Sequence, residues 1–178
     1  MDAWDGYLGS RNRILGFIAE RRIRNPVIIT GDVHNNWAVD LKADFNNPNS
    51  QTVGTEFVGT SITSGGDGAD TNPRAQSIVA ENPHLQFFNG QRGYVSCVLT
   101  PESFRADYRV VPYVSQRGAP IHTRASFEVA DGQPGAQQVG GEAIPAPPSV
   151  ARVSAAIELD PERIEAQERA DRESRSRR

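Results

Sequence analysis

An aspartate and a histidine, Asp32 and His34, stand two residues apart directly after the apolar run Val27-Ile28-Ile29. A continuous β-branched run of this kind is typical of a strand buried on both faces in a parallel sheet. Side chains two positions apart on an extended segment point to the same side, so Asp32 and His34 are expected to converge beyond the carboxyl end of this strand. That edge of an α/β sheet is where ligands and metals usually bind. A carboxylate and an imidazole there suit a hydrolytic metal site.

The same two residues also fit a purely structural role. Asp32 would then accept backbone amides after the strand, and His34 would pack nearby. The adjacent Asn35 and Asn36 could add carbonyl oxygens to a hard cation such as calcium, although neighbouring asparagines more often form a turn. At this point the residue types leave a metal site and a capping pair both open.

Three further positions carry polar groups that could contact a phosphate. The segment 56–64 runs from a strand into a glycine- and hydroxyl-rich loop that could offer amides to phosphate oxygens. His84 could donate a proton or bind an anion, and Arg92 could bind phosphate through two parallel hydrogen bonds. Composition favours the ordinary alternatives, namely a polar loop and turns in which these side chains satisfy nearby carbonyls. His122 precedes a strand without a polar cluster and is expected at the surface.

Hydrophobic periodicity and turn signals predict the elements that would position these residues. A helix over 11–24, capped by Ser10, should end at Asn25-Pro26 and lead into a strand over 27–31. Residues 35–50 should be irregular. A second strand is expected over 53–60, and Pro73 should begin a helix that ends near residue 81. Further strands are predicted at 85–89, 93–100, 104–113 and 122–129. The fold class is therefore α/β (α+β), largely antiparallel after residue 50.

Composition divides the chain into a foldable part, 1–131, a Gly/Pro/Ala-rich linker, 132–160, and a charged, disordered tail, 161–178. A net charge of −3 gives no basic signature for nucleic acid. No apolar run is long enough to cross a membrane, and no signal peptide is expected. Cys97, the only cysteine, lies in an alternating strand pattern and is expected to be a buried thiol.

Four motifs in register resemble the PhoD-like alkaline phosphatases, which are secreted bacterial metallophosphoesterases. The resemblance covers residues 2–135. Its motifs are Trp4-Asp5-Gly6-Tyr7, Thr30-Gly31-Asp32-Val33-His34 with Trp37, Glu56-Phe57-Val58-Gly59-Thr60-Ser61-Ile62-Thr63-Ser64, and Asn82-Pro83-His84 through Arg92-Gly93-Tyr94. The resemblance implies the second half of a metallophosphoesterase αββα sandwich, a cluster of iron and calcium, and a phosphate ester as substrate. It also implies that Asp32 and His34 are ligands to those metals.

The family's remaining metal ligands are an Asp and Tyr pair, a Cys, a further Asp and an Asn, and they belong to a first half that is not recognisable here. Cys97 does not match the ligand cysteine. The resemblance therefore implies phosphoric ester hydrolysis by a larger or split enzyme, in which the missing amino-terminal half could be a separate chain. This chain alone is expected to be inactive. The alternative is a non-catalytic, β-rich interaction module derived from such an enzyme.

Overall fold

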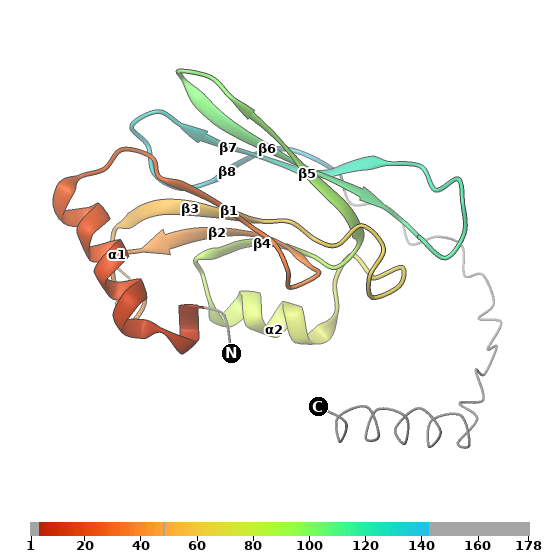
Figure 1. Cartoon of the computed structure of the whole chain (residues 1–178), viewed down its shortest axis with the longest axis horizontal. Helices are drawn as coiled ribbons and strands as arrows, with labels where there is room; N and C mark the ends of the chain where they lie inside the picture. Colours follow the sequence, from red (N-terminus) through yellow and green to blue (C-terminus); the bar gives the residue numbers. More distant parts are fainter. Residues whose placement is uncertain (1–3, 48, 143–178) are drawn as a thin grey trace, which may run out of the picture. The chain divides into compact units, whose positions relative to one another are not determined.

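The computed structural model describes residues 4–47 and 49–142, which form two four-stranded β-sheets and three helical segments (Figure 1). The helical segments are η1 (Trp4–Gly6), α1 (Leu8–Arg21) and α2 (Pro73–Glu81). The first sheet contains β1 (Val27–Thr30), β2 (Asn36–Lys42), β3 (Thr52–Val58) and β4 (Leu85–Asn89). The second contains β5 (Arg92–Leu99), β6 (Ser103–Val111), β7 (His122–Ala130) and β8 (Gln137–Gly140).

The first sheet has the strand order β1-β3-β2-β4 and mixes both pairing directions. β1 runs parallel to β3, with Val27 opposite Thr55 and Thr30 opposite Val58. β2 is antiparallel to both of its neighbours, β3 and β4. Because β1 and β3 point the same way, their carboxyl ends lie at one edge of the sheet. The connection from β1 to β2 must therefore pass the carboxyl end of β3.

The second sheet is antiparallel throughout, with the strand order β5-β6-β7-β8. The two residues Gly90 and Gln91 carry the chain from β4 in the first sheet to β5 in the second. The β5–β6 ladder is continuous, whereas β6–β7 and β7–β8 each contain an irregularity. The predicted antiparallel arrangement of the second half of the chain is confirmed.

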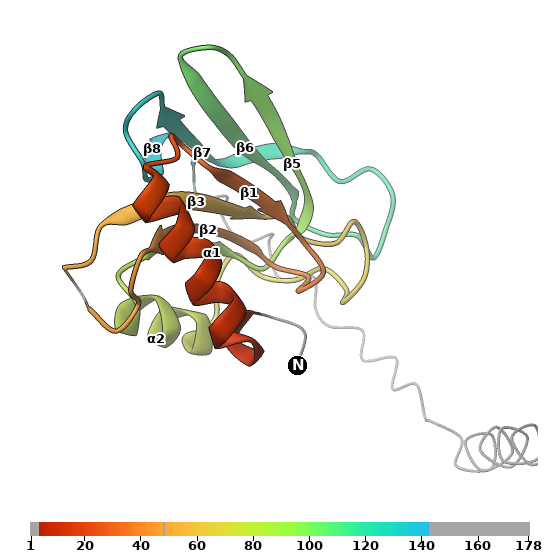
Figure 2. The same cartoon turned by 60° about the vertical axis from the view of Figure 1, so that its left-hand side comes forward.

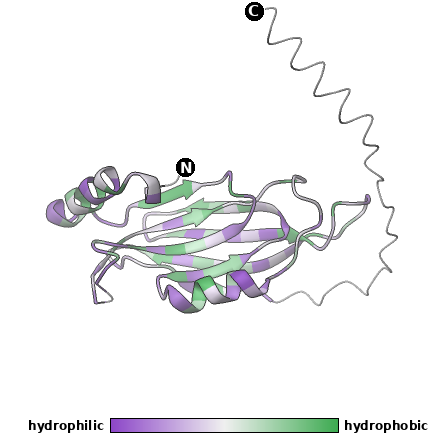
Figure 3. Ribbon diagram, turned by 90° about the horizontal axis from the view of Figure 1, so that it is seen from below, coloured by the Kyte–Doolittle hydropathy of each residue, from purple (hydrophilic) through white to green (hydrophobic). Residues whose placement is uncertain are grey.

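The sheets pack face to face around four aromatic rings. Phe57, Phe87, Tyr108 and Phe127 form pairs whose ring centroids lie 4.9–6.4 Å apart. Burial raises the pKa of Tyr108, and its hydroxyl donates to the carbonyl of Trp37 in the first sheet. Figure 3 shows that hydrophobic residues are concentrated in the strands. The interior of the sandwich is thus an aromatic layer with one cross-sheet hydrogen bond.

Helices cover the other face of the first sheet (Figures 1 and 2). Leu15 and Ile18, three residues apart on α1, are buried in a second cluster with Val39, Leu41 and Val53. The described residues contribute no helix to the outer face of the second sheet. They provide the layers α, β and β in that order. The fold is a β-rich α+β arrangement, as the sequence predicted, and none of its described helices has the length and apolarity that a membrane span requires.

Some predicted elements agree closely with the structure. The predicted helix over 73–81 coincides with α2, where Pro73 stands in the first turn and the side chain of Asn72 accepts a hydrogen bond from the Ala75 amide at 2.9 Å. α1 begins earlier than predicted, at Leu8, with Tyr7 rather than Ser10 at its N-cap. Its amino end is held by backbone bonds instead of a side-chain cap.

Other predictions are wrong because they depend on which strands lie at sheet edges. β1 is not buried on both faces: it is the edge strand of its sheet, and Ile29 is 60% exposed. Cys97 is exposed rather than buried because β5 is also an edge strand. The segment 35–50, predicted to be irregular, contains β2.

Regular structure also continues past residue 131. Gln137–Gly140, inside the predicted linker, form β8 and pair with β7. Ala136 just before this strand is buried in the core between the sheets. The predicted disordered tail, 161–178, and the remainder of the linker lie outside the described residues.

Candidate functional site

The candidate ligands occupy a tight loop, residues 31–35, between β1 and β2. Asp32 has φ 72° and His34 has φ 55°, so both have left-handed backbone conformations. The prediction that Asp32 and His34 lie on an extended segment is therefore wrong, although both lie beyond the carboxyl end of β1, as expected. Non-glycine residues are uncommon in this region, and such strain tends to occur at binding and catalytic sites. Arg22 and Asn25 share this backbone conformation, so it is the presence of two candidate ligands in one loop, and not the conformation alone, that distinguishes residues 31–35.

The segment after β3 holds both ends of this loop. The Gly59 amide donates to the Thr30 carbonyl at 2.9 Å, and the Thr60 amide donates to the side-chain oxygen of Asn36 at 3.1 Å. A Cβ at Gly31 would stand 3.6 Å from the Gly59 carbonyl, so the two backbones run close together. The loops after the parallel strands β1 and β3 are thereby joined into one unit.

Asn36 belongs to a buried polar network. It is fully buried, and its amide group donates to the Asn89 side-chain oxygen at 3.0 Å. Asn89 in turn donates to Asp70 and to Gln91, both at 2.9 Å. Its oxygen also accepts the Thr60 amide, so the side chain of Asn36 bonds at both ends within this network.

This network also joins the two sheets. Arg124 on β7 binds Asp70 through two nitrogens, with the Nη2–Oδ2 distance at 3.1 Å. Burial alone would raise the pKa of Asp70, but hydrogen bonds from Arg124 and Asn89, together with the Arg124 charge, hold it below the ordinary value. Sequence reasoning missed Asn89, Asp70 and Arg124. A polar residue at the end of the apolar run Phe87-Phe88 was the one available signal.

Asp32 and His34 themselves are exposed, and neither side chain forms a hydrogen bond or ion pair with another described residue. The Asn35 amide group donates to the Val33 carbonyl at 3.0 Å, which leaves its oxygen without a hydrogen bond inside the described part of the chain. The nearby Thr60 hydroxyl is buried and unpaired there too. This donor set of carboxylate, imidazole and amide oxygens fits a metal ion. It is a partial set, because the described residues contain no group of three metal-binding side chains.

Arg92 has a structural position instead of a phosphate-binding one. Its side chain is buried and donates to the Ser61 hydroxyl at 2.8 Å and to the carbonyls of Ser64 and Gly90. Burial lowers the pKa of its guanidinium. A Cβ at Gly68 would lie 2.0 Å from the Gly90 carbonyl, so the glycine-rich loop that contains Gly68 packs closely against the link between β4 and β5. Hydrogen bonds from Arg92 therefore hold the glycine-rich loop, and both terminal nitrogens of its guanidinium already donate to protein acceptors.

The other two histidines are not part of the loop that carries Asp32 and His34. β2 and β4 pair with Asn36 opposite Asn89, and His84 precedes the other end of β4. Five residues of strand separate His84 from Asn89, which corresponds to roughly 17 Å. The His84 ring meets Phe45 edge-on at 5.0 Å, and burial and the Lys42 charge lower its pKa. His122 is half-buried at the start of β7.

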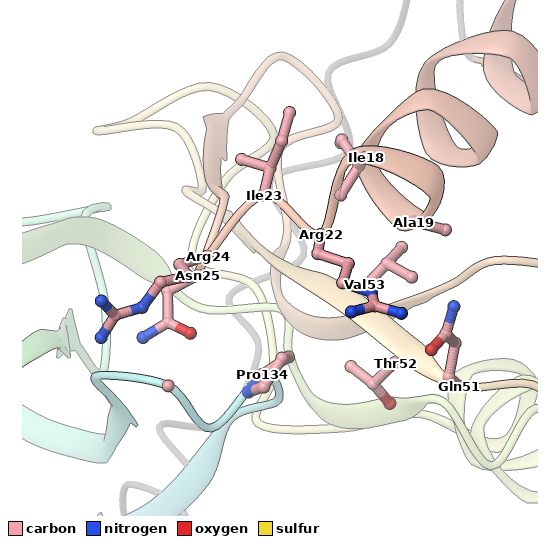
Figure 4. A pocket seen from close by; sticks show the side chains of 11 residues that line it. Ile18, Ala19, Arg22, Ile23, Arg24, Asn25, Gln51, Thr52, Val53 and Pro134 are labelled. Carbon is pink, nitrogen blue, oxygen red and sulfur yellow. The ribbon is translucent and has the colours of Figure 1, made fainter.

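A cavity of about 190 Å³ lies at the opposite end of β3 from this loop. Figure 4 shows Arg22, Gln51 and Thr52 around it, with Asn25 and Pro134 on the other side. No candidate ligand lines this cavity. Asp32 and His34 instead stand on an open edge, and a substrate pocket around them would need additional walls.

Comparison with known proteins agrees with the arrangement of motifs. The family model described as PhoD-like phosphatase matches residues 1–108, which is more than half of the chain. The chain belongs to the PhoD-like phosphatase family. A curated relative, Alkaline phosphatase D of Bacillus subtilis (strain 168), is 51% identical over 144 residues. A solved structure described as "Structure of PhoD" superposes with a TM-score of 0.76 at 50% identity and covers 80% of this chain.

These relatives of the PhoD-like chain are much longer. The matched residues are 81% of this chain but 25% of the Bacillus subtilis protein, and this chain covers 27% of the solved PhoD chain. The chain thus spans about a quarter of the length of the relatives it matches. The described part of the chain holds one piece of the PhoD fold, with two candidate ligands at the open edge of a sheet.

Proposed function

We propose that this chain takes part in metal-dependent hydrolysis of phosphate esters, as one portion of a PhoD-like alkaline phosphatase or phosphodiesterase. The observation that carries the proposal is the loop 31–35. In a chain of this family, two exposed metal-binding side chains have left-handed backbones and are held by hydrogen bonds from a neighbouring loop. A fold maintains such strain where the surrounding contacts over-determine it.

In this proposal Asp32 supplies a carboxylate oxygen and His34 an imidazole nitrogen to metal ions, with calcium and iron as the metals that the resemblance implies. Bound metal ions would supply Lewis-acid stabilisation of the phosphoryl oxygens and an activated oxygen nucleophile. The residues of this chain hold and orient those two donors. Asn36 fixes the carboxyl side of the loop through Thr60, and the Gly59 amide fixes the Thr30 side. Two donors leave the site incomplete, because protein metal sites that hold an ion firmly use three or four protein ligands.

The chain alone is therefore expected to be inactive. Purified chain should hydrolyse p-nitrophenyl phosphate and bis-p-nitrophenyl phosphate no faster than its Asp32→Ala variant, with calcium and iron present. A metal-dependent turnover that Asp32→Ala abolishes would contradict the idea that further ligands are needed.

A chimera tests the ligand role itself. The matched 144 residues of the Bacillus subtilis protein would be replaced by the corresponding residues of this chain. We expect metal-dependent hydrolysis that Asp32→Ala and His34→Ala each reduce at least a hundredfold, together with a loss of bound metal measured by elemental analysis. Glu81→Ala and His122→Ala are the matched controls, since both lie outside the loop. Full activity and metal content in the Asp32 and His34 variants would overturn the proposal.

The alternative is a non-catalytic, β-rich interaction module that has kept the fold. The incomplete ligand set among the described residues is the observation in its favour. An inactive, metal-free chimera that nevertheless folds would support this alternative.

A further inference from the structure

Three loops project from the same end of the two sheets. Loop 31–35 follows β1, the glycine-rich loop 59–72 follows β3, and loop 112–121 connects β6 to β7. Arg92 at the start of β5 pairs with Val111 at the end of β6, and its side chain donates to the glycine-rich loop. The connection from β6 to β7 therefore starts beside the glycine-rich loop, at the end of the sandwich that carries the candidate ligands (Figures 1 and 2).

Asp67 in the glycine-rich loop holds loop 112–121 in place. Its carboxylate accepts the backbone amides of Val114 at 2.7 Å and Ser115 at 2.8 Å, and the Ser115 hydroxyl at 3.0 Å. These bonds, and above all the one from the Val114 amide, lower the pKa of Asp67, so the carboxylate is charged at neutral pH. Hydrogen bonds to a charged acceptor are stronger than those between neutral groups. One side chain thus fixes two consecutive residues of a distant loop.

Loop 112–121 is longer than the connection between two antiparallel neighbours requires. Hairpins are usually closed by two to five residues, and the turn from β5 to β6 uses residues 100–102. Loops that a rigid scaffold positions often carry binding residues. The tip of this loop, residues 115–118, is exposed, and there Gln116 and Arg117 have side chains that donate hydrogen bonds.

The order of the three loops restricts what this tip can contact. The glycine-rich loop stands between loop 31–35 and loop 112–121 in both views of the fold (Figures 1 and 2). A phosphoryl group held by metal ions at Asp32 and His34 is compact and lies on the far side of the glycine-rich loop from the tip. A large substituent on the phosphorus is needed to extend that far.

We propose that loop 112–121 is a specificity element for phosphodiesters. In this proposal Gln116 and Arg117 donate hydrogen bonds to the ester group that stays on the phosphorus, and Asp67 is the positioning residue that holds the loop. The preferred substrates are diesters whose retained group is large and carries several oxygen acceptors, such as a nucleoside. The inference rests on the proposed function, since it concerns the substrate of that same site.

Hydrogen exchange of the free chain, followed by NMR, tests the positioning role without any activity. Asp67→Ala should accelerate exchange of the Val114 and Ser115 amides at least tenfold, because both lose their acceptor. Asp67→Asn keeps an acceptor oxygen but loses the charge, so it should have a smaller effect. Glu102→Ala, which removes an exposed carboxylate from the turn between β5 and β6, is the matched control and should change neither amide.

The chimera described above tests the specificity. Methyl p-nitrophenyl phosphate and thymidine 5′-(p-nitrophenyl phosphate) release the same leaving group and differ only in the ester group that is retained. Asp67→Ala should raise KM for the thymidine ester at least about fivefold, as the loss of one or two hydrogen bonds predicts. The kcat values, and KM for the methyl ester, should stay within about twofold. The double variant Gln116→Ala, Arg117→Ala should give the same KM change and leave exchange of the Val114 and Ser115 amides as in the wild type, which separates contact from positioning.

Two results would overturn this inference alone. One is unchanged amide exchange in Asp67→Ala. The other is an active chimera in which the Asp67 variant or the double variant changes KM for both esters equally, or for neither. A folded chimera that hydrolyses neither ester with any metal would instead overturn the proposed function, and this inference with it.

Discussion

Replacing Asn89 with alanine should destabilise the fold severely, because this side chain is the centre of the buried polar network. Asn89 is completely buried and accepts from the Asn36 amide group and the Gln91 backbone amide, both at 3.0 Å. Asn89→Ala leaves these two donors buried without an acceptor, since Asn36 and Gln91 are 0% and 5% exposed. At about 1–3 kcal/mol for each unsatisfied buried group, the loss is about 4 kcal/mol in the free energy of unfolding. Domains of this size have only about 5–15 kcal/mol in total.

Urea unfolding followed by circular dichroism would measure this loss, at concentrations where sedimentation shows a single species. Asn46→Ala is the control, because the exposed Asn46 side chain donates to no other described residue, and it should change stability by under about 0.5 kcal/mol. The double variant Asn36→Ala, Asn89→Ala should cost at least about 1 kcal/mol less than the sum of the single variants. An Asn89→Ala loss below about 1 kcal/mol, or strict additivity, would refute the network argument.

Further measurements test the acid response, one glycine contact and the open edge. Burial opposes ionisation of Asp70, but the hydrogen bonds from Arg124 and Asn89 outweigh it and lower its pKa. The contribution of ionised Asp70 to folding stability is therefore complete above the ordinary pKa of 3.8 and is lost as the pH falls through the lowered pKa. As the pH is lowered below about 4, the urea midpoint of the wild type should therefore decrease, and that of Asp70→Asn should decrease less. An equal decrease in the two proteins would contradict this. Gly68→Ala should lower the free energy of unfolding by more than about 2 kcal/mol, because the new Cβ would lie 2.0 Å from the Gly90 carbonyl. Gly66→Ala should lower it by about 1 kcal/mol, because Gly66 is also left-handed but a Cβ there meets nothing within 4 Å. β1 and β5 are exposed edge strands and should make the free chain associate. The thermal midpoint and the light scattering of the chain should therefore vary with protein concentration. A monodisperse chain whose melt does not depend on concentration would contradict this.

Sequence reasoning located the elements whose signals are local. Pro73 favours the first turn of a helix, and α2 begins there. Alternation over β6 and β7 likewise predicted two antiparallel strands. β2 was missed because turn-favouring asparagines precede and follow it, although Trp37, Val39 and Leu41 have the strand period.

The failures concern properties that depend on distant parts of the chain. Whether Ile29 or Cys97 is buried depends on which strands lie at sheet edges, and local pattern does not specify that. The position of Asp32 and His34 after β1 followed from the sequence, but their left-handed backbones did not. Those conformations depend on contacts with Gly59 and Thr60, which lie beyond β2 in the chain.

The path of the chain from β1 to β2 has a consequence for the order of folding. Asp32 and His34 are synthesised before every residue that holds their loop in place, including Gly59, Thr60 and Asn89. β1 pairs with β3, and the whole of β2 lies between these two strands in the sequence. In contrast, β5, β6 and β7 each pair with the next strand in the sequence. Non-local pairings of this kind form late because a longer loop must close first. The two candidate metal ligands, which are synthesised before Gly59, Thr60 and Asn89, are thus among the last side chains of this sheet to reach their final geometry, and a cation cannot bind them in that geometry until the rest of the sheet has formed.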